Sequence, residues 1–390
     1  METTWWTQPE QLDAHQSAVV ALPLTGNHLV IGPPGSGKTN LLILRGTYLY
    51  RAGIHNIVVL TFGRVLREFL SSGSVNYDFP PDKIQTYKRW AASLITENCG
   101  EFDDTGSFEE IRARLKSGLE QVAAMDNPAN ICECILIDEA QDYSVDEMKL
   151  ITKLAKQVFA VGDDRQRIYE ASGSIDHLKG TMDNVNELPF HYRNGIKICR
   201  VADGIQNQIE SDDGMESTSN YDENQYPSTV LHLKDEHISS QVESAISEIE
   251  TQLRAYPDGM IGVLCPRHEE LDAVASALQA SSLADQVQVQ KYADGYSSFE
   301  PQRRIIATTV HGAKGLEFRA LHLLGMDKIS KFRQAQRNLA YTAVTRAKTS
   351  LAIYHDGTLP GYLENGIKAA SNEVVSPPNL ADLFKRGFSC

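Results

Sequence analysis

The sequence predicts an α/β protein of two similar lobes, each a mostly parallel sheet flanked by helices. Its 390 residues are many for one core and suit two domains of about 100 to 200 residues each. From residue 29 onward, short apolar runs alternate with amphipathic stretches, as in a parallel sheet covered by helices. Because this alternation restarts after about residue 185, we expect lobes over 1–185 and 186–370 and a tail over 371–390.

The elements of the first lobe follow from apolar runs and their spacing. Strands are expected in the runs at 28–33, 56–62, 83–86, 132–138 and 157–163. Helices are expected at 41–53, 64–70 and 87–100, and a capping box of Ser107 and Glu110 opens one more. In this order the elements alternate along the chain, which predicts parallel strands.

The second lobe repeats the pattern. Strands are expected at 228–234, 260–265, 303–310, 319–326 and 349–355, with helices at 241–256 and 267–280. The intervening stretch 210–227 is polar and acidic without apolar period, so we expect an exposed loop there.

Composition and charge limit the classes of function. Fifty-one acidic and 37 basic residues give a net charge of −14. Because an acidic surface as a whole does not attract phosphates, any binding site for nucleic acid must be a local groove. The six cysteines lack the paired spacing of a zinc site and are expected to be free thiols. No run approaches the roughly 18 apolar residues of a membrane span, and the start of the chain lacks the parts of a signal peptide. A cytoplasmic protein without a membrane partner is therefore expected.

A phosphate-binding loop is the strongest single motif. It follows a predicted strand, precedes a predicted helix, and comprises Gly32, Pro33, Pro34, Gly35, Ser36, Gly37, Lys38 and Thr39. Backbone N–H groups freed by the glycines would surround phosphates, Lys38 would reach the β and γ phosphates, and the Thr39 hydroxyl would bind magnesium. We therefore expect ATP and Mg²⁺ as ligands, with Asn40 next to the loop as part of the nucleotide site.

A carboxylate that holds magnesium is expected at the end of a neighbouring buried strand. The segment CECILIDEAQD at 132–142 supplies one, because apolar residues run directly into Asp138. Glu139 follows and is placed to polarise the attacking water as a general base. An Asp-Glu pair after a strand is a weak signal alone, but the phosphate loop in the same lobe makes it strong.

Beyond these two motifs the sequence resembles the superfamily 1 helicases of the UvrD and Rep kind over nearly its whole length. Eight motifs stand in the family's order: LDAHQ, VVLTF, IQTYKRW, DEAQD, VGDDRQRIY, LPFHYRN, TTVHGAKGLEF and RNLAYTAVTRAK. The resemblance implies two RecA-like P-loop NTPase lobes, an ATPase stimulated by single-stranded DNA, and movement in the 3′ to 5′ direction.

The resemblance also implies roles for single residues. On the nucleotide side, Gln16 would read adenine and Tyr192 would stack on it, and Gly315 and Glu317 would lie toward the nucleotide. Catalytic roles are implied for Gln166, which would couple the γ phosphate to the strand, and for the arginine fingers Arg193 and Arg346. The residues implied to contact the strand are Thr61, Phe62, Thr86, Tyr87, Thr309 and His311.

The positions of the two arginines in the sequence have a mechanistic consequence, because both belong to the second lobe while the phosphate loop belongs to the first. ATP would then sit in the cleft, and closure would bring both guanidinium groups onto the developing charge. If each lobe grips the strand separately, alternating closure and release produces translocation.

The chain departs from the family pattern in three places. The tryptophan usual in the third motif is replaced by Ala171 and Ser172, which weakens strand binding unless another aromatic substitutes. The sixth motif has Gln336 and Asn338 where charged residues are usual. Both accessory insertions of UvrD-type enzymes look absent or vestigial, so we expect a minimal motor with weak intrinsic strand separation.

The sequence thus predicts an ATP-dependent translocase or helicase acting on single-stranded DNA or a tailed duplex. The main alternative is a DNA-stimulated ATP switch that controls a protein partner, such as a nuclease in a repair or defence complex. A nucleotide or small-molecule kinase would explain the phosphate loop but not VHGAKGLEF or the TRAK segment. The sequence leaves open the pathway, the partner, the oligomeric state and the choice of DNA over RNA.

Overall fold

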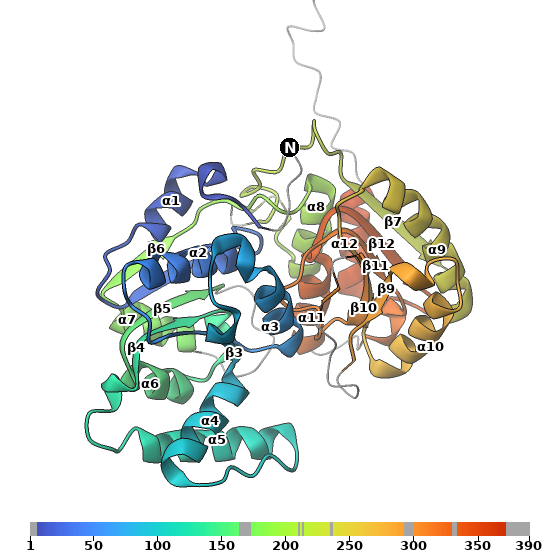
Figure 1. The fold of residues 1–390 in the computed structure, drawn as a ribbon. Coiled ribbons are helices and arrows are strands. Elements are labelled where there is room, and N and C mark those ends of the chain that lie inside the picture. Colours follow the sequence, from blue (N-terminus) through green and yellow to red (C-terminus); the bar gives the residue numbers. More distant parts are fainter. Residues whose placement is uncertain are drawn as a thin grey trace, which may run out of the picture.

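Two parallel sheets form the framework of the protein. The computed structural model describes residues 6–163, 173–209, 211–212, 214–234, 237–291, 299–300, 302–329 and 334–371. Within these residues each sheet has six strands, and every pairing between strands is parallel. Figure 1 shows the two sheets side by side, each flanked by helices. The predicted α/β architecture of two RecA-like lobes is confirmed.

The first sheet has the order β3-β2-β4-β5-β1-β6. Its strands are β1 (His28–Ile31), β2 (Ile57–Thr61), β3 (Ile84–Thr86), β4 (Cys132–Ile137), β5 (Ala155–Gly162) and β6 (Asn184–Glu187). The helices of this lobe are α1 (Ala14–Val20), α2 (Lys38–Arg51), α3 (Arg64–Gly73), α4 (Tyr87–Cys99), α5 (Phe108–Val122), α6 (Val145–Lys153) and α7 (Ser174–Thr181). Edge strand β6 crosses the boundary expected at residue 185 and pairs with β1.

The second sheet has the order β7-β12-β11-β8-β10-β9. Its strands are β7 (Thr229–Lys234), β8 (Ile261–Cys265), β9 (Val287–Val289), β10 (Ile305–Thr309), β11 (Phe318–Leu323) and β12 (Ala347–His355). The helices are α8 (Ile196–Gln206), α9 (Ile238–Ala255), α10 (His268–Gln279), α11 (Gln334–Val344) and α12 (Gly361–Ser371). The expected tail lies outside the described residues apart from Ser371, the last residue of α12.

Burial explains why the central strands were recognisable in the sequence. Every residue of β1, β2, β8 and β10 is buried, because helices cover both faces of a parallel sheet. Such strands read as unbroken apolar runs. Edge strand β6, with the sequence NVNE and three exposed residues of four, carries no such signal and was not predicted.

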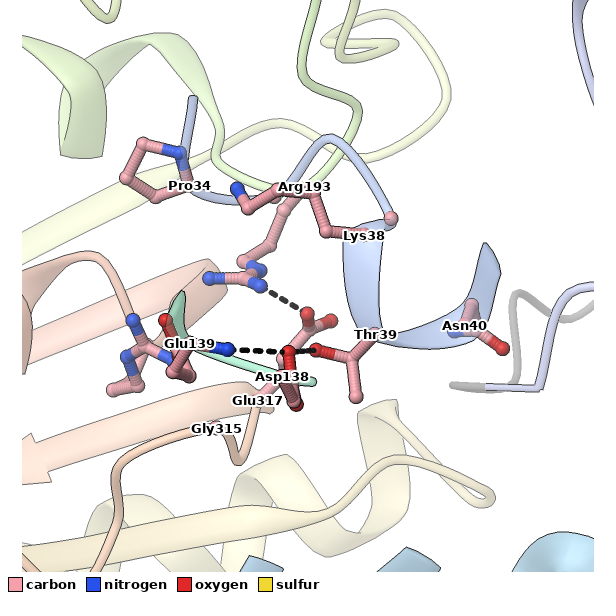
Figure 2. Close-up of a pocket in the computed structure, with 12 residues that line it drawn as sticks. Pro34, Lys38, Thr39, Asn40, Asp138, Glu139, Arg193, Gly315 and Glu317 are labelled. Carbon is pink, nitrogen blue, oxygen red and sulfur yellow. Dashed lines mark hydrogen bonds and ion pairs between the residues drawn. The ribbon is translucent and has the colours of Figure 1, made fainter. Parts of the chain in front are cut away.

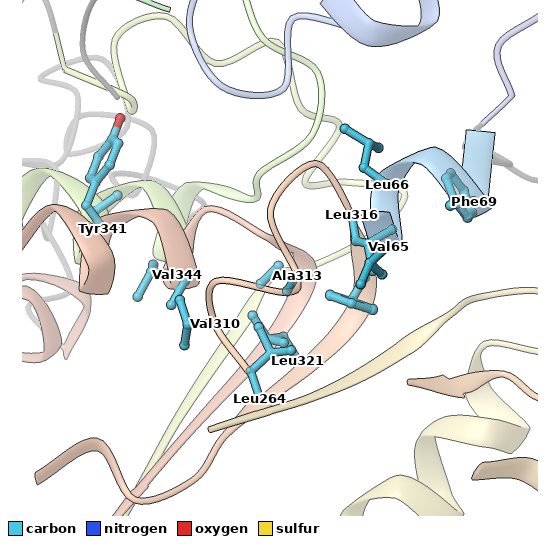
Figure 3. Close-up of a cluster of buried hydrophobic side chains, with 14 of the residues drawn as sticks. Val65, Leu66, Phe69, Leu264, Val310, Ala313, Leu316, Leu321, Tyr341 and Val344 are labelled. Carbon is cyan, nitrogen blue, oxygen red and sulfur yellow. The ribbon is translucent and has the colours of Figure 1, made fainter. Parts of the chain in front are cut away.

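One apolar cluster spans both lobes. Helix α3 contributes Val65 and Leu66 to it, and the loop after β10 contributes Val310, Ala313 and Leu316. Figure 3 shows Val65 and Leu66 of α3 beside Leu316 of that loop. The contact fastens the start of α3 to the loop that carries the VHGAKGLEF motif.

The acidic segment 210–227 contains no helix or strand in its described part, as expected for a loop, but it is not simply exposed. Its Met215 side chain is 1% exposed and belongs to the apolar cluster shared by both lobes. Asp203 of α8 holds the segment by accepting hydrogen bonds from the backbone N–H groups of Met215 at 2.6 Å and Glu216 at 2.9 Å. An acidic loop is thus anchored by a buried methionine.

No described helix combines the length and the apolar character needed to cross a membrane. The cysteines in the part of the chain that the structure describes are free thiols, and no group of three metal-binding side chains occurs there.

Candidate nucleotide cleft and strand groove

The phosphate loop joins β1 to α2 at the edge where parallel strands end. Gly35 and Gly37 have φ of +83° and +84°, in the left-handed region that favours glycine. At Gly35 a Cβ atom would lie 2.5 Å from the Cβ of Arg193, which belongs to the second lobe. The loop therefore needs glycine both for its turn and for the close approach of the other lobe.

The Lys38 amine lies within the loop. Its Nζ donates hydrogen bonds to the carbonyl oxygens of Gly32 and Pro33, both at 2.8 Å. Burial lowers the pKa of Lys38, while Asp163 and Glu139 act to raise it. Phosphate oxygens would be stronger partners for this buried cation than two neutral carbonyls.

Asp138 has the surroundings of a metal ligand. Its Oδ1 accepts hydrogen bonds from the Thr39 hydroxyl at 3.2 Å and from the Glu139 backbone N–H at 3.0 Å. Its Oδ2 is buried and has no hydrogen-bond partner. Burial and the neighbouring Glu139 raise the pKa of Asp138 to about 7. A buried carboxylate oxygen without a partner, beside a hydroxyl, fits a magnesium ion, whose preferred ligands are oxygen atoms.

Glu139 stays ionised although it is buried. Burial acts to raise its pKa, but Lys314, Arg346 and Lys38 outweigh burial and lower the pKa. The Gln141 amide donates a hydrogen bond to Glu139 Oε2 at 2.5 Å. Glu139 also has a φ of +49°, unusual for a residue with a side chain, and such strained backbone is common at functional sites. The geometry suits a carboxylate that accepts a proton.

The second lobe supplies three charged side chains to the cleft, Arg193, Glu317 and Arg346. Arg193 forms an ion pair with Glu317 and donates a hydrogen bond to the Thr345 carbonyl at 3.1 Å. Lys348 pairs with the other oxygen of Glu317 at 3.1 Å. Burial acts to raise the pKa of Glu317, but these cations lower it to about 2. Arg346 is 2% exposed, and burial together with Arg193 lowers its pKa to about 10.

These groups from both lobes enclose one cavity. Figure 2 shows Pro34, Lys38 and Thr39 of the phosphate loop and its helix with Arg193 beside them, and Glu317 and Gly315 near Asp138 and Glu139. The side chains and glycines that line it are Pro34, Gly35, Gly37, Lys38, Thr39, Asn40, Asp138, Glu139, Arg193, Gly315, Glu317 and Arg346. Each of these positions was singled out from the sequence. Gln166 lies outside the described residues.

Two further predicted nucleotide residues lie against the outer side of the phosphate loop. Gln16 donates a hydrogen bond to the Ser36 carbonyl at 3.1 Å, and the Tyr192 backbone N–H donates to the Gly35 carbonyl at 3.1 Å. The Tyr192 hydroxyl donates to Asp13, which caps α1 together with Gln16. Tyr192 is 38% exposed beside the loop.

A second hollow crosses the junction between the lobes on the other side of Glu139. Five of the predicted strand-contacting residues line it: Phe62, Thr86, Tyr87, Thr309 and His311. We call this hollow the strand groove. The sixth, Thr61, does not line it, because its side chain at the end of β2 is fully buried and its hydroxyl points to the Gly63 carbonyl at 3.4 Å. Glu139 lines both the strand groove and the nucleotide cavity, so the two sites are in direct contact.

Several groove residues escaped the sequence-based selection. Lys314 of the second lobe forms an ion pair with Asp142 of the first, and Asp142 is only 1% exposed. Both lie inside quoted motifs, VHGAKGLEF and DEAQD, so a charge-pairing search between motifs could have found them. Phe108 and Arg112 of α5 also line the groove, but their helix showed only an ordinary capping signal.

The fold and the cleft together define a P-loop NTPase whose nucleotide site is completed by a second lobe. Comparison with known proteins agrees: an AAA domain matches residues 15–172, and a UvrD-like helicase C-terminal domain matches residues 304–354. These matches, together with the relative described next, confirm the resemblance to UvrD/Rep-like superfamily 1 helicases seen in its motifs.

Individual relatives are distant. A probable DNA helicase of Mycoplasma pneumoniae (strain ATCC 29342 / M129 / Subtype 1) is 26% identical over 284 residues, which cover 66% of this chain and 49% of that protein. The chain thus spans about half the length of this curated relative. The C-terminal domain of a possible DNA helicase from Lactobacillus plantarum WCFS1 is 21% identical, with a TM-score of 0.32, over 46% of this chain and 96% of that one. The PRRSV helicase is 16% identical, with a TM-score of 0.41, over 87% of this chain and 54% of that one.

Proposed function

We propose that this protein hydrolyses ATP in the cleft between its lobes and uses the hydrolysis to move along single-stranded DNA, in the 3′ to 5′ direction typical of its family. The observation that carries the proposal is the composition of the nucleotide cavity. Lys38 and Asp138 of the first lobe and Arg193 and Arg346 of the second line one space. A site assembled from two lobes changes their separation when its ligand is cleaved.

The roles of the first-lobe residues follow from their chemistry. The phosphate loop and Lys38 would bind the β and γ phosphates in place of the two carbonyls that Lys38 now contacts. Thr39 and Asp138 would hold magnesium, which neutralises phosphate charge when bound. Glu139, kept ionised by nearby cations, would orient the attacking water and accept its proton.

The second-lobe arginines would stabilise the charge that develops on the transferred phosphoryl group. Arg346 is held by the Thr342 carbonyl at 3.2 Å, and Arg193 by Glu317 and Thr345, so protein contacts fix the position of both. Prepositioned donors stabilise a transition state without a reorganisation cost. When the γ phosphate leaves, the attraction that closes the lobes is lost.

The strand groove supports the link to nucleic acid. Thr86 and Phe62 on the first lobe face Thr309 and His311 on the second across the same hollow. A strand lying there would be gripped by both lobes, and closure would shift one grip relative to the other. Because Glu139 lines both spaces, occupancy of the groove can affect hydrolysis directly.

We also propose that intrinsic strand separation is weak. Between β3 and β4 the chain forms the helices α4 and α5 and one short 3-10 helix, in the place where UvrD-type enzymes insert an accessory domain. A partner protein, such as a nuclease, would then supply or use the motor. If ATP hydrolysis merely signals to that partner, the protein acts as a switch, the alternative function.

The test is the ATPase rate with and without single-stranded DNA. Lys38→Ala should lose about a hundredfold or more of the stimulated rate, since it removes a charged donor from the phosphates. Lys153→Ala, at the exposed end of α6, is the matched control and should behave like the wild type. Absence of any ATPase activity in the wild type would refute the proposal.

Tailed duplexes of both polarities then separate the two candidate functions. Displacement of a labelled strand from a 3′-tailed duplex, and not from a 5′-tailed one, is expected for the translocase, with low processivity. Stimulation of the ATPase without strand displacement or movement on single strands would favour the switch. Processive unwinding of long duplexes by the isolated protein would refute weak intrinsic separation.

A further inference from the structure

Phe108 exposes an aromatic ring on the wall of the strand groove. It is the first residue of α5, directly after the N-cap Ser107, and its side chain is 52% exposed. Of the other phenylalanine and tyrosine residues of the groove, Tyr87 is only 4% exposed and Phe62 is half-buried. A large apolar ring that is this exposed inside a groove does not serve the packing of the core and is available to contact a ligand.

The ring is held in place by its neighbours. Phe108 meets Phe62 edge to face, with ring centroids 6.3 Å apart and planes at 64°. The Arg112 guanidinium lies 6.0 Å from the Phe108 centroid and 5.4 Å from that of Phe62. Glu147 in turn accepts a hydrogen bond from Arg112 Nε at 2.7 Å. A ring fixed in this way loses little conformational freedom when a ligand stacks on it.

The charges of the groove indicate the kind of ligand. Arg64, Lys88, Arg112 and Lys314 line it with two carboxylates, in a protein whose net charge is −14. Three of these cations also form ion pairs, Lys88 with Asp104, Arg112 with Glu147 and Lys314 with Asp142. Cationic side chains beside an exposed aromatic ring are how proteins bind single-stranded nucleic acid, since cations meet phosphates and rings meet bases. The groove therefore fits a single strand with one base against the ring.

We propose that Phe108 is a stacking platform for a nucleobase of the bound single strand. It would take over the part of the tryptophan that this chain replaces by Ala171 and Ser172 in its third motif. The platform is then supplied by α5, which lies between β3 and β4, where the family carries an accessory insertion. This inference rests on the proposed function, because it names a contact made by the same strand in the same groove.

Binding of a fluorescently labelled oligothymidylate, followed by anisotropy, tests the platform. Phe108→Ala should weaken binding by about 5- to 150-fold, the range for one base stacked on an aromatic side chain. The slope of log Kd against log salt should stay unchanged, because no phosphate contact is removed. Phe108→Trp should keep or tighten binding. The control is Met125→Ala, which removes a side chain 40% exposed beyond the end of α5 and outside the groove.

A single abasic site moved along the oligonucleotide distinguishes stacking from packing. The wild type should lose affinity most strongly at one position, where the base over Phe108 is missing. Phe108→Ala should show no further loss at that position, because two changes that remove one contact are not additive. Thermal unfolding should show that the variant still folds, with a midpoint within a few degrees of the wild type, since only half of the ring is buried.

The stacking role is refuted if Phe108→Ala binds the oligonucleotide as well as the wild type does. It is also refuted if the variant keeps the wild-type abasic profile, or if its salt slope falls. A wild type that binds no single strand and shows no stimulated ATPase would refute the proposed function itself. Normal stimulation of the wild type with an unaffected Phe108→Ala would refute only the platform.

Discussion

Gly315 lies at a contact between the two lobes that leaves no space for a side chain. Its φ is +84°, and a Cβ atom there would lie 2.4 Å from Leu66 Cδ2 of α3. Leu66 belongs to the first lobe and lies in the apolar cluster that includes Leu316, as Figure 3 shows. Gly315→Ala therefore places one methyl group into the junction between the lobes.

The substitution has two free-energy costs, and they differ in whether they depend on the lobes being together. The left-handed backbone costs an alanine about 1 to 2 kcal/mol, and this cost is present whether the lobes are together or apart. The overlap with Leu66 costs about 1 to 3 kcal/mol more, as for other overpacked contacts, and only when the lobes are together. Since Arg193 and Arg346 meet the phosphate loop only in that state, the second cost alone should lower kcat/KM for ATP, by about 5- to 150-fold.

The assay is steady-state ATP hydrolysis by Gly315→Ala, Leu66→Ala and the double variant. Removing the Leu66 side chain frees the space, so in the Leu66→Ala background the added methyl group should cost little activity. Gly53→Ala is the matched control, because Gly53 has a φ of +97° and a Cβ atom there would meet nothing within 4 Å. It should lower the unfolding midpoint by a few degrees and leave kcat/KM unchanged.

The reasoning is refuted if Gly315→Ala lowers kcat/KM by the same factor in both backgrounds. Equal losses would mean that the methyl group acts within its own lobe. Wild-type kcat/KM in Gly315→Ala would also refute it, since the lobes would then tolerate the overlap.

Two further predictions concern buried charges. Glu317→Gln should destabilise the protein at pH 7 by about 3 to 5 kcal/mol, because it leaves buried cations without a counter-ion. Since the pKa of Glu317 is lowered from 4.5 to about 2, up to about 3 kcal/mol of stabilisation is present above pH 4.5 and lost as pH falls toward 2. Urea unfolding should therefore show that the difference in free energy of unfolding between the wild type and the variant becomes smaller over that range. A difference that stays constant with pH would contradict the ion pair. Lys314→Met should leave the buried Asp142 carboxylate unpaired and lower the unfolding midpoint, and adding Asp142→Asn should recover most of the loss. A double variant as unstable as the sum of both single changes would show that the two groups do not interact.

Local sequence determined the elements whose signals act within a few residues. The phosphate loop was recognisable because a turn between strand and helix that binds phosphate needs glycines, Lys38 and Thr39 at fixed spacing. Asp138 and Glu139 were recognisable because the buried apolar run that ends β4 stands directly before them. The central strands were predicted correctly for the same reason, and the fold class followed from their alternation with helices.

Tertiary structure decided everything that depends on which faces meet. Whether Thr61 faces the groove or the sheet depends on the rotation of one strand end, which periodicity does not report. The ion pair of Lys314 with Asp142 joins residues 172 positions apart in the chain, and the contact of Gly315 with Leu66 also crosses between lobes. Phe108 looked like an ordinary helix start until the fold placed it in the groove. Sequence pattern identifies chemical groups and local backbone, whereas proximity between lobes arises only when both cores have packed.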